Sequence, residues 1–188
     1  MTLNDRAIHR NREMIEGFNP DNVNPISYDV TLHCIILRER HPWYVHLLDW
    51  LDNRRVGSAS TSMHRFDRID ISSYTKANPF WMRNGDFILA STQEIFHLPD
   101  TIGANFFLKS STGRLGYGHQ LAGLCDPGWH DSRLTMELFH PCKTPLPLYP
   151  GLEIGQMVFF EVEAPEVSYA VKGHYNGDLA AQESRMDV

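Results

Sequence analysis

The chain has 188 residues, of which 42% are hydrophobic, and its formal net charge at pH 7 is −6. This length suits one domain with a core of its own, and the negative charge argues against broad nucleic-acid binding, which needs a basic surface. Apolar runs such as residues 34–37 are far shorter than the roughly 20 residues of a membrane span, so we expect no membrane segment.

The N-terminal region is polar and contains no apolar signal core, so we expect a cytoplasmic protein. Asn4 can cap a helix with a partial apolar face, and Gly17 can end that helix. Residues 19–25 are rich in turn-forming Asn and Pro. From Ile26 onward, polar and apolar residues alternate, which predicts a strand.

The rest of the chain is typical of an all-β protein. Residues 38–78 give no clear pattern, and residues 41–51 fit either a short helix or a pair of buried strands. Beyond them, short strands separated by turns are expected at 86–91, 105–108, 134–139, 147–149 and 154–162. This spacing predicts an antiparallel sandwich or barrel, and the absence of repeats and linkers predicts one domain over residues 1–188.

Residues 109–116, KSSTGRLG, combine cationic side chains with hydroxyl groups and glycines. Glycines let the backbone turn tightly so that successive N–H groups point at an anion, and the side chains add further donors. The spacing fits neither a Walker loop nor a Rossmann fingerprint. The residues alone therefore leave open a phosphate-binding loop and a polar surface turn, since such clusters are common in loops.

Two further segments carry residues that suit a binding site. Residues 126–129, Asp-Pro-Gly-Trp, predict a turn backed by an aromatic side chain. In the strand over 134–139, alternation places Glu137 on the same face as Thr135 and opposite Met136. A glutamate there is either exposed to solvent, which is the commoner case, or held in a pocket.

A zinc site is not expected. Zinc-dependent nucleobase deaminases carry an H-x-E motif and a P-C-x-x-C motif. No histidine of this chain opens an H-x-E triplet, and no second cysteine follows Pro141-Cys142 at that spacing. The three cysteines are widely spaced and odd in number, which predicts buried, reduced thiols and no disulfide framework.

The order of these motifs resembles the dCTP deaminase branch of the dUTPase-like superfamily. The resemblance rests on KSSTGRLG, AGLCDPGW, LTMELF and PLPLYPGLEIGQMVFF, with NPISYDVTL and DFILASTQEIFHLPDTI upstream. It covers residues 24–32, most of 85–160 and, loosely, 169–185, whereas residues 38–78 match nothing in the family.

The resemblance implies an antiparallel β fold, a distorted barrel or jelly roll, with a short N-terminal helix. It implies a homotrimer with active sites at subunit interfaces. It also implies hydrolytic deamination of a deoxycytidine nucleotide, dCTP to dUTP and ammonia, by acid–base catalysis without a catalytic metal. Mg²⁺ would enter bound to the substrate triphosphate.

The resemblance also assigns roles to individual residues. The loop that holds the phosphates and completes the active site would comprise Lys109, Ser110, Ser111, Thr112, Gly113 and Arg114. Glu137 would be the catalytic acid–base group, oriented by Arg114 and assisted by Ser110. The Ala122 carbonyl would face the amino group of the base, and Asp126 would hold the deoxyribose. Thr135 and Met136 would read the base edge through the backbone.

The C-terminal segment, residues 169–185, resembles the part of the family fold that covers the nucleotide, and Tyr169 would belong to it. His174 stands where the family has a lysine, and a histidine carries less positive charge near neutral pH. Asp178 stands where the family has a glutamine and would repel phosphate unless a metal lies between them. Lys109 replaces an arginine and lacks its bidentate geometry.

Three other functions share this set of motifs. A bifunctional enzyme would deaminate dCTP and also cleave the triphosphate to release dUMP. A dUTPase is disfavoured by Glu137, because dUTPases generally lack a glutamate on that strand. A catalytically inactive nucleotide-binding regulator is favoured only by the altered C-terminal segment, and a fold alone does not decide function.

Overall fold

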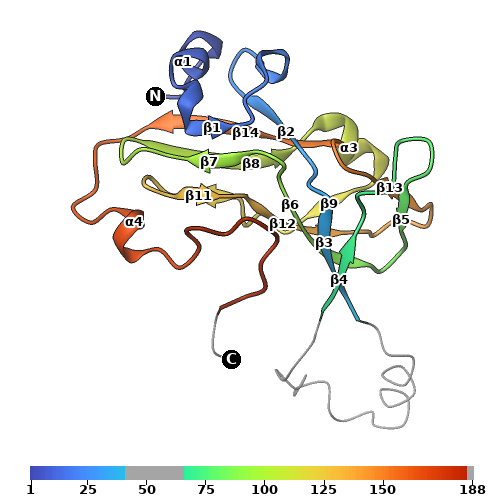
Figure 1. The fold of residues 1–188 in the computed structure, drawn as a ribbon. Coiled ribbons are helices and arrows are strands. Elements are labelled where there is room, and N and C mark those ends of the chain that lie inside the picture. Colours follow the sequence, from blue (N-terminus) through green and yellow to red (C-terminus); the bar gives the residue numbers. More distant parts are fainter. Residues whose placement is uncertain (41–65, 186–188) are drawn as a thin grey trace.

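The computed structural model describes residues 1–40 and 66–185, and it confirms the expected all-β fold (Figure 1). The helices are α1 (Asp5–Arg10), α3 (Ser110–Leu115) and α4 (Tyr169–Lys172), with 3-10 turns at Arg12–Met14 and Pro20–Asn22. None of the helices within these two ranges is long and apolar enough to span a membrane.

The strands are short, and every pairing between them is antiparallel in the described residues. They are β1 (Ile15–Glu16), β2 (Tyr28–Thr31), β3 (Ile35–Glu39), β4 (Phe66–Asp70), β5 (Phe80–Met82), β6 (Phe87–Ser91), β7 (Ile95–His97), β8 (Ile102–Leu108), β9 (Gly118–His119), β10 (Leu124–Cys125), β11 (His130–Ser132), β12 (Thr135–Phe139), β13 (Leu146–Leu148) and β14 (Glu153–Glu161).

Two sheets form the body of the fold. One has the order β10-β8-β14-β2 and the other β4-β3-β6-β12-β9, with smaller β1-β7-β11 and β13-β5 sheets beside them. Apolar side chains from these sheets make one continuous core, in which Tyr28, Phe96, Met136 and Phe159 are fully buried. The core thereby fixes the positions of the loops that carry the polar residues discussed below.

The N-terminal helix is shorter than the sequence predicts. Asn4 caps it as expected, because its side chain accepts a hydrogen bond of 3.0 Å from the Ala7 backbone N–H. The predicted end at Gly17 is wrong, since the helix stops at Arg10 and Ile15–Glu16 pair with β7. Backbone pairing with the sheet overrides the local helical preference here, and Gly17, at φ +81°, follows the strand.

The strand prediction around Glu137 is confirmed. Along β12 the side chains alternate, with Met136 and Leu138 fully buried and Thr135 and Glu137 half-buried. In the sheet, Glu137 lies opposite Leu89 of β6, and Leu138 lies opposite His119 of β9. Glu137 therefore projects from the outer face of the sheet, away from the core.

Two other predictions have different outcomes. The choice between helix and strand for residues 41–51 lies outside the described residues. The cysteines are free, but only Cys125 is buried, whereas Cys34 is half-buried and Cys142 exposed. The expectation of buried thiols thus holds fully only for Cys125, and it is wrong for Cys142, which lies in the turn between β12 and β13 and not on the inner face of a strand.

Candidate active site

A cavity of about 520 Å³ lies against the outer face of β12, within the range usual for small-molecule sites. Its walls come from β6 and β12, the segment 122–129, α4 and the C-terminal segment. Six of the residues that the resemblance singled out line it: Ala122, Asp126, Thr135, Glu137, Tyr169 and Asp178. The C-terminal segment, drawn in red, passes beside β11 and β12 to form the outer wall (Figure 1).

Glu137 is the carboxylate at the inner wall of this cavity. Its side chain is 24% exposed, and its Oε2 lies 3.3 Å from Nε2 of His119. The two atoms are not aligned as a hydrogen bond, and neither is hydrogen-bonded to any other described residue. Buried carboxylate oxygens normally have partners, so an unpaired one at a cavity wall suits a group that exchanges protons with a ligand.

The Asp126-Pro-Gly-Trp turn forms as predicted, and its aromatic residue holds the C-terminal segment. The backbone N–H of Trp129 donates to the Asp126 carbonyl at 3.1 Å, and Gly128 adopts φ +86°. The Trp129 ring stacks on Phe96 with 5.7 Å between centroids, while its Nε1–H donates to the Tyr175 carbonyl at 2.9 Å. The turn therefore presents Asp126 to the cavity and anchors the segment that closes it.

Tyr169, the first residue of α4, borders the same cavity as Asp126. Burial raises the pKa of its hydroxyl above the ordinary value, and the charge of Asp126 adds to that shift. The hydroxyl therefore stays protonated at neutral pH and is available as a hydrogen-bond donor.

Within the C-terminal segment, Arg185 compensates the negative charge of Asp178, which was expected to repel phosphate. Asp178 is buried, and its Oδ1 accepts a hydrogen bond of 2.6 Å from Nη2 of Arg185. Arg185 also lies over the Tyr175 ring, with Cζ 5.0 Å from the centroid. His174, in contrast, is exposed and is not part of the cavity lining in the described chain. Sequence reasoning missed Arg185, whose only signal is a cation seven residues beyond Asp178.

The same segment rests on a small apolar cluster separate from the main core. Leu37, Leu89 and Ala181 form this cluster, with Phe66 and Phe87 packed against it. The Gln182 N–H also donates to Oγ1 of Thr135 at 3.1 Å. The outer wall of the cavity is thus attached directly to the strand that carries Glu137.

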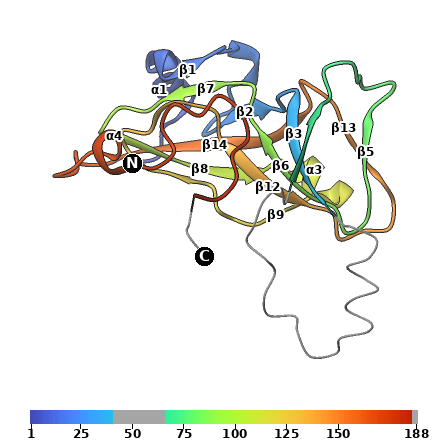
Figure 2. The same ribbon diagram turned by 60° about the horizontal axis from the view of Figure 1, so that its bottom comes forward.

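The predicted phosphate loop does not reach the cavity within one chain. Residues 110–115 form the short helix α3, and the chain turns at Gly116 with φ +109°. Ser110, Ser111 and Arg114 are exposed, and no residue from 109 to 114 is among the cavity-lining residues of the described chain. Both views place α3 and α4 at opposite ends of the molecule (Figures 1 and 2).

Thr112 and Gly113 of this helix do not form part of an anion-binding loop. The Thr112 side chain is buried, with Oγ1 2.7 Å from the Lys109 carbonyl and 2.9 Å from the Ile154 carbonyl. Gly113 lies inside the helix with open space beside its Cα, so it does not form the tight anion-binding turn that the composition suggested.

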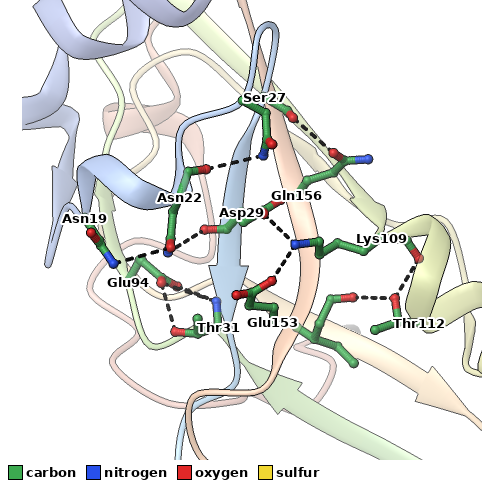
Figure 3. A network of polar contacts seen from close by, with 12 residues as sticks. Asn19, Asn22, Ser27, Asp29, Thr31, Glu94, Lys109, Thr112, Glu153 and Gln156 are labelled. Atoms are coloured by element: carbon green, nitrogen blue, oxygen red, sulfur yellow. Dashed lines mark hydrogen bonds and ion pairs between the residues drawn. The ribbon is translucent and has the colours of Figure 1, made fainter.

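Lys109 is bound to carboxylates of its own chain (Figure 3). Its Nζ lies 2.5 Å from Oδ2 of Asp29 and 2.5 Å from Oε2 of Glu153. Burial alone lowers the pKa of the ammonium, but the two carboxylates outweigh it and raise the pKa above the ordinary value. Lys109 therefore links β2 to β14 as a permanent cation, and any phosphate would have to share it with both acids.

Replacing Lys109 by methionine is expected to lower the free energy of unfolding by about 1–3 kcal/mol. The Asp29 side chain is only 11% exposed and would lose its cation. Glu153→Gln is the matched control, because that side chain is 56% exposed and should contribute about 0–1 kcal/mol. Urea denaturation measures both, and equal stability of Lys109→Met and the parent would contradict the linkage.

No three or more His, Cys, Asp or Glu side chains in residues 1–40 and 66–185 are grouped so that they could hold a metal ion.

Comparisons with known proteins identify the family of the chain. The family described as dCTP deaminase-like matches residues 2–162. The "dCTP deaminase, dUMP-forming" of Mycobacterium marinum is 31% identical over an alignment of 194 residues, which covers 98% of this chain and 95% of the relative. The protein of the same name from Mycobacterium tuberculosis is 34% identical over 170 residues, or 88% and 83% of the two chains.

A solved structure shares the fold. The 2′-deoxycytidine 5′-triphosphate deaminase from Agrobacterium tumefaciens superposes with a TM-score of 0.62 at 20% sequence identity. The match covers 86% of this chain and 48% of that one, so this chain spans about half the length of the solved chain. The matches to the family and to the mycobacterial relatives cover most of the sequence, and this chain belongs to the dCTP deaminase-like family.

Proposed function

We propose that this protein hydrolyses dCTP to dUTP and ammonia. The observation that supports this most directly is the composition of the cavity, which gathers Glu137 with Ala122, Asp126, Thr135 and Tyr169. The mycobacterial relatives and the Agrobacterium protein carry names that specify the same nucleotide.

The proposed chemistry needs one carboxylate able to move protons. Water attacks C4 of the cytosine ring, N3 gains a proton, and the amino group leaves as ammonia. Glu137 would take one proton of the attacking water and give it to N3, and would then carry the hydroxyl proton of the tetrahedral intermediate to the leaving amino group, which is ordinary general acid–base catalysis. The Ala122 carbonyl would accept a hydrogen bond from the amino group. The Met136 side chain is fully buried, so this residue would contact the base through its backbone alone.

We further propose that a neighbouring subunit completes the site. Ser110, Ser111 and Arg114 are exposed on α3 and do not line the cavity of their own described chain. In a closed ring of subunits, α3 of one copy can cover the cavity of the next, and closed symmetry is the usual form of homo-oligomers. The triphosphate, with its bound Mg²⁺, would then lie between the two subunits.

This arrangement requires an oligomer, and the family resemblance implies a trimer. Light scattering is expected to give three times the 21.6 kDa mass of the chain. A stable monomer with full activity would show that a single chain contains the whole site.

A second candidate activity is cleavage of the triphosphate after deamination, which yields dUMP and pyrophosphate. It is favoured by the mycobacterial relatives, whose names specify dUMP formation. Incubation with dCTP, dCMP, 5-substituted dCTP and dUTP, followed by chromatography, distinguishes the candidates. dUTP plus ammonia supports the deaminase alone, and dUMP plus pyrophosphate supports the bifunctional enzyme. Tight nucleotide binding without turnover would indicate a regulator.

A further inference from the structure

His119 is a buried histidine whose ring faces Glu137. Its side chain is 3% exposed, and it lies on β9, which pairs with β12 beside Glu137. Its Nε2 approaches Oε2 of Glu137 to 3.3 Å, and neither atom is hydrogen-bonded to another described residue. The ring is held edge-on against Phe106, with 4.8 Å between the ring centroids. Its orientation is therefore fixed by packing.

The other ring nitrogen of His119 determines where the proton lies. The backbone N–H of Leu121 donates to Nδ1 at 3.2 Å, so Nδ1 must be the unprotonated acceptor. A neutral His119 then carries its hydrogen on Nε2, the nitrogen that faces Glu137. Leu121 adopts φ +62°, a conformation that costs energy for a side chain of this size. This strained turn aims its N–H back at the ring and places Ala122 next in the chain.

From this geometry we infer that His119 is a positioning residue for Glu137, an inference that rests on the proposed deaminase activity. Its Nε2–H donates to Oε2 and fixes the plane of the carboxylate, which leaves Oε1 to serve the attacking water. A small rotation of Glu137 converts the present 3.3 Å approach into an aligned hydrogen bond. Hydrogen bonds of this kind commonly tighten once substrate is bound.

Three variants separate positioning from packing. His119→Phe keeps a ring against Phe106 but removes the donor, and kcat is expected to fall about 10- to 100-fold while KM stays near the parental value. His119→Gln retains an amide N–H that can reach Glu137 and should recover most of the lost rate. His9→Phe is the matched control, because His9 also packs edge-on against an aromatic ring, that of Phe18, and should leave kcat unchanged.

A double-mutant cycle tests whether His119 acts through Glu137. In a Glu137→Gln background, His119→Phe is expected to cause no further loss of the residual rate. An equal fractional loss in both backgrounds, or a parental kcat in the His119→Phe single variant, would overturn the inference.

A second measurement does not depend on turnover. Nitrogen NMR of the folded protein should show the Nε2–H tautomer for His119, with the Nε2 signal shifting in Glu137→Gln. If the parent protein fails to deaminate dCTP, the proposed function fails while this result still reports the contact. A His119 protonated on Nδ1 would contradict the inference whatever the activity.

Discussion

Replacing Glu137 by glutamine is expected to reduce turnover of dCTP by a factor of about 10²–10⁴, the usual loss when a general acid–base group is removed. Glutamine has the same size as glutamate but cannot take a proton from water. The carboxylate faces the cavity from β12, whereas the phosphates are assigned to the exposed residues of α3, so the substitution removes no group assigned to the phosphates. Nucleotide affinity should therefore remain close to the parental value.

Rate and affinity should be measured on the same preparation, by product chromatography and by calorimetry. Thr135→Ser is a suitable control, because it is a conservative change on the same strand face and keeps the hydroxyl that accepts from the Gln182 N–H. Near-parental turnover by Glu137→Gln would show that this residue lines the cavity but does not take part in catalysis. The chemistry would then have to be sought at the phosphates, beginning with Asp126.

Mixing two inactive variants is expected to restore activity if the site is shared between subunits. Arg114→Ala removes the contribution of α3, and Glu137→Gln removes the contribution of the cavity. In trimers assembled from equal amounts, each site receives its intact α3 with a probability of one half and its intact cavity with the same probability. About one quarter of the parental activity should therefore return.

The control mixture combines Glu137→Gln with Asp126→Ala. Both residues line the cavity of one chain, so no subunit arrangement brings an intact pair together. This mixture should stay inactive. In each mixture the two variants should be unfolded and refolded together, so that their subunits exchange. Recovery in the control, or none in the test mixture, would contradict the assignment of α3 to the neighbouring subunit.

The parts of the fold that sequence predicted are those with a long, regular pattern. The strand at 134–139 was predictable because one face is buried against the core and the other is not. Strands of two or three residues, such as β9, β10 and β11, are too short to show a period. The sequence therefore gives no signal for His119, since its approach to Glu137 exists only through the pairing of β9 with β12.

For Lys109 the sequence does give a local signal, but the fold changes its meaning. A lysine beside hydroxyls and glycines is typical of an anion-binding loop, and the family pattern strengthens that interpretation. Its partners Asp29 and Glu153 lie 80 and 44 residues away, where no local pattern connects them to it. Electrostatic partners at such distances are set by sheet order, so a role assigned from a short motif can be changed by the fold around it.

The attachment of the C-terminal segment has a consequence for how the cavity exchanges its contents. Beyond α4 this segment is held by the small cluster around Ala181 and by hydrogen bonds to residues 129–135, and it adds no residue to the main core. Its local opening free energy is therefore smaller than that of unfolding the whole sheet, because little apolar surface is released. We therefore expect that displacing this one segment would open the cavity while β6 and β12 stay in place. On that expectation, the residues that hold the segment would set how the cavity opens, and the residues of the main core would set the thermal stability of the fold.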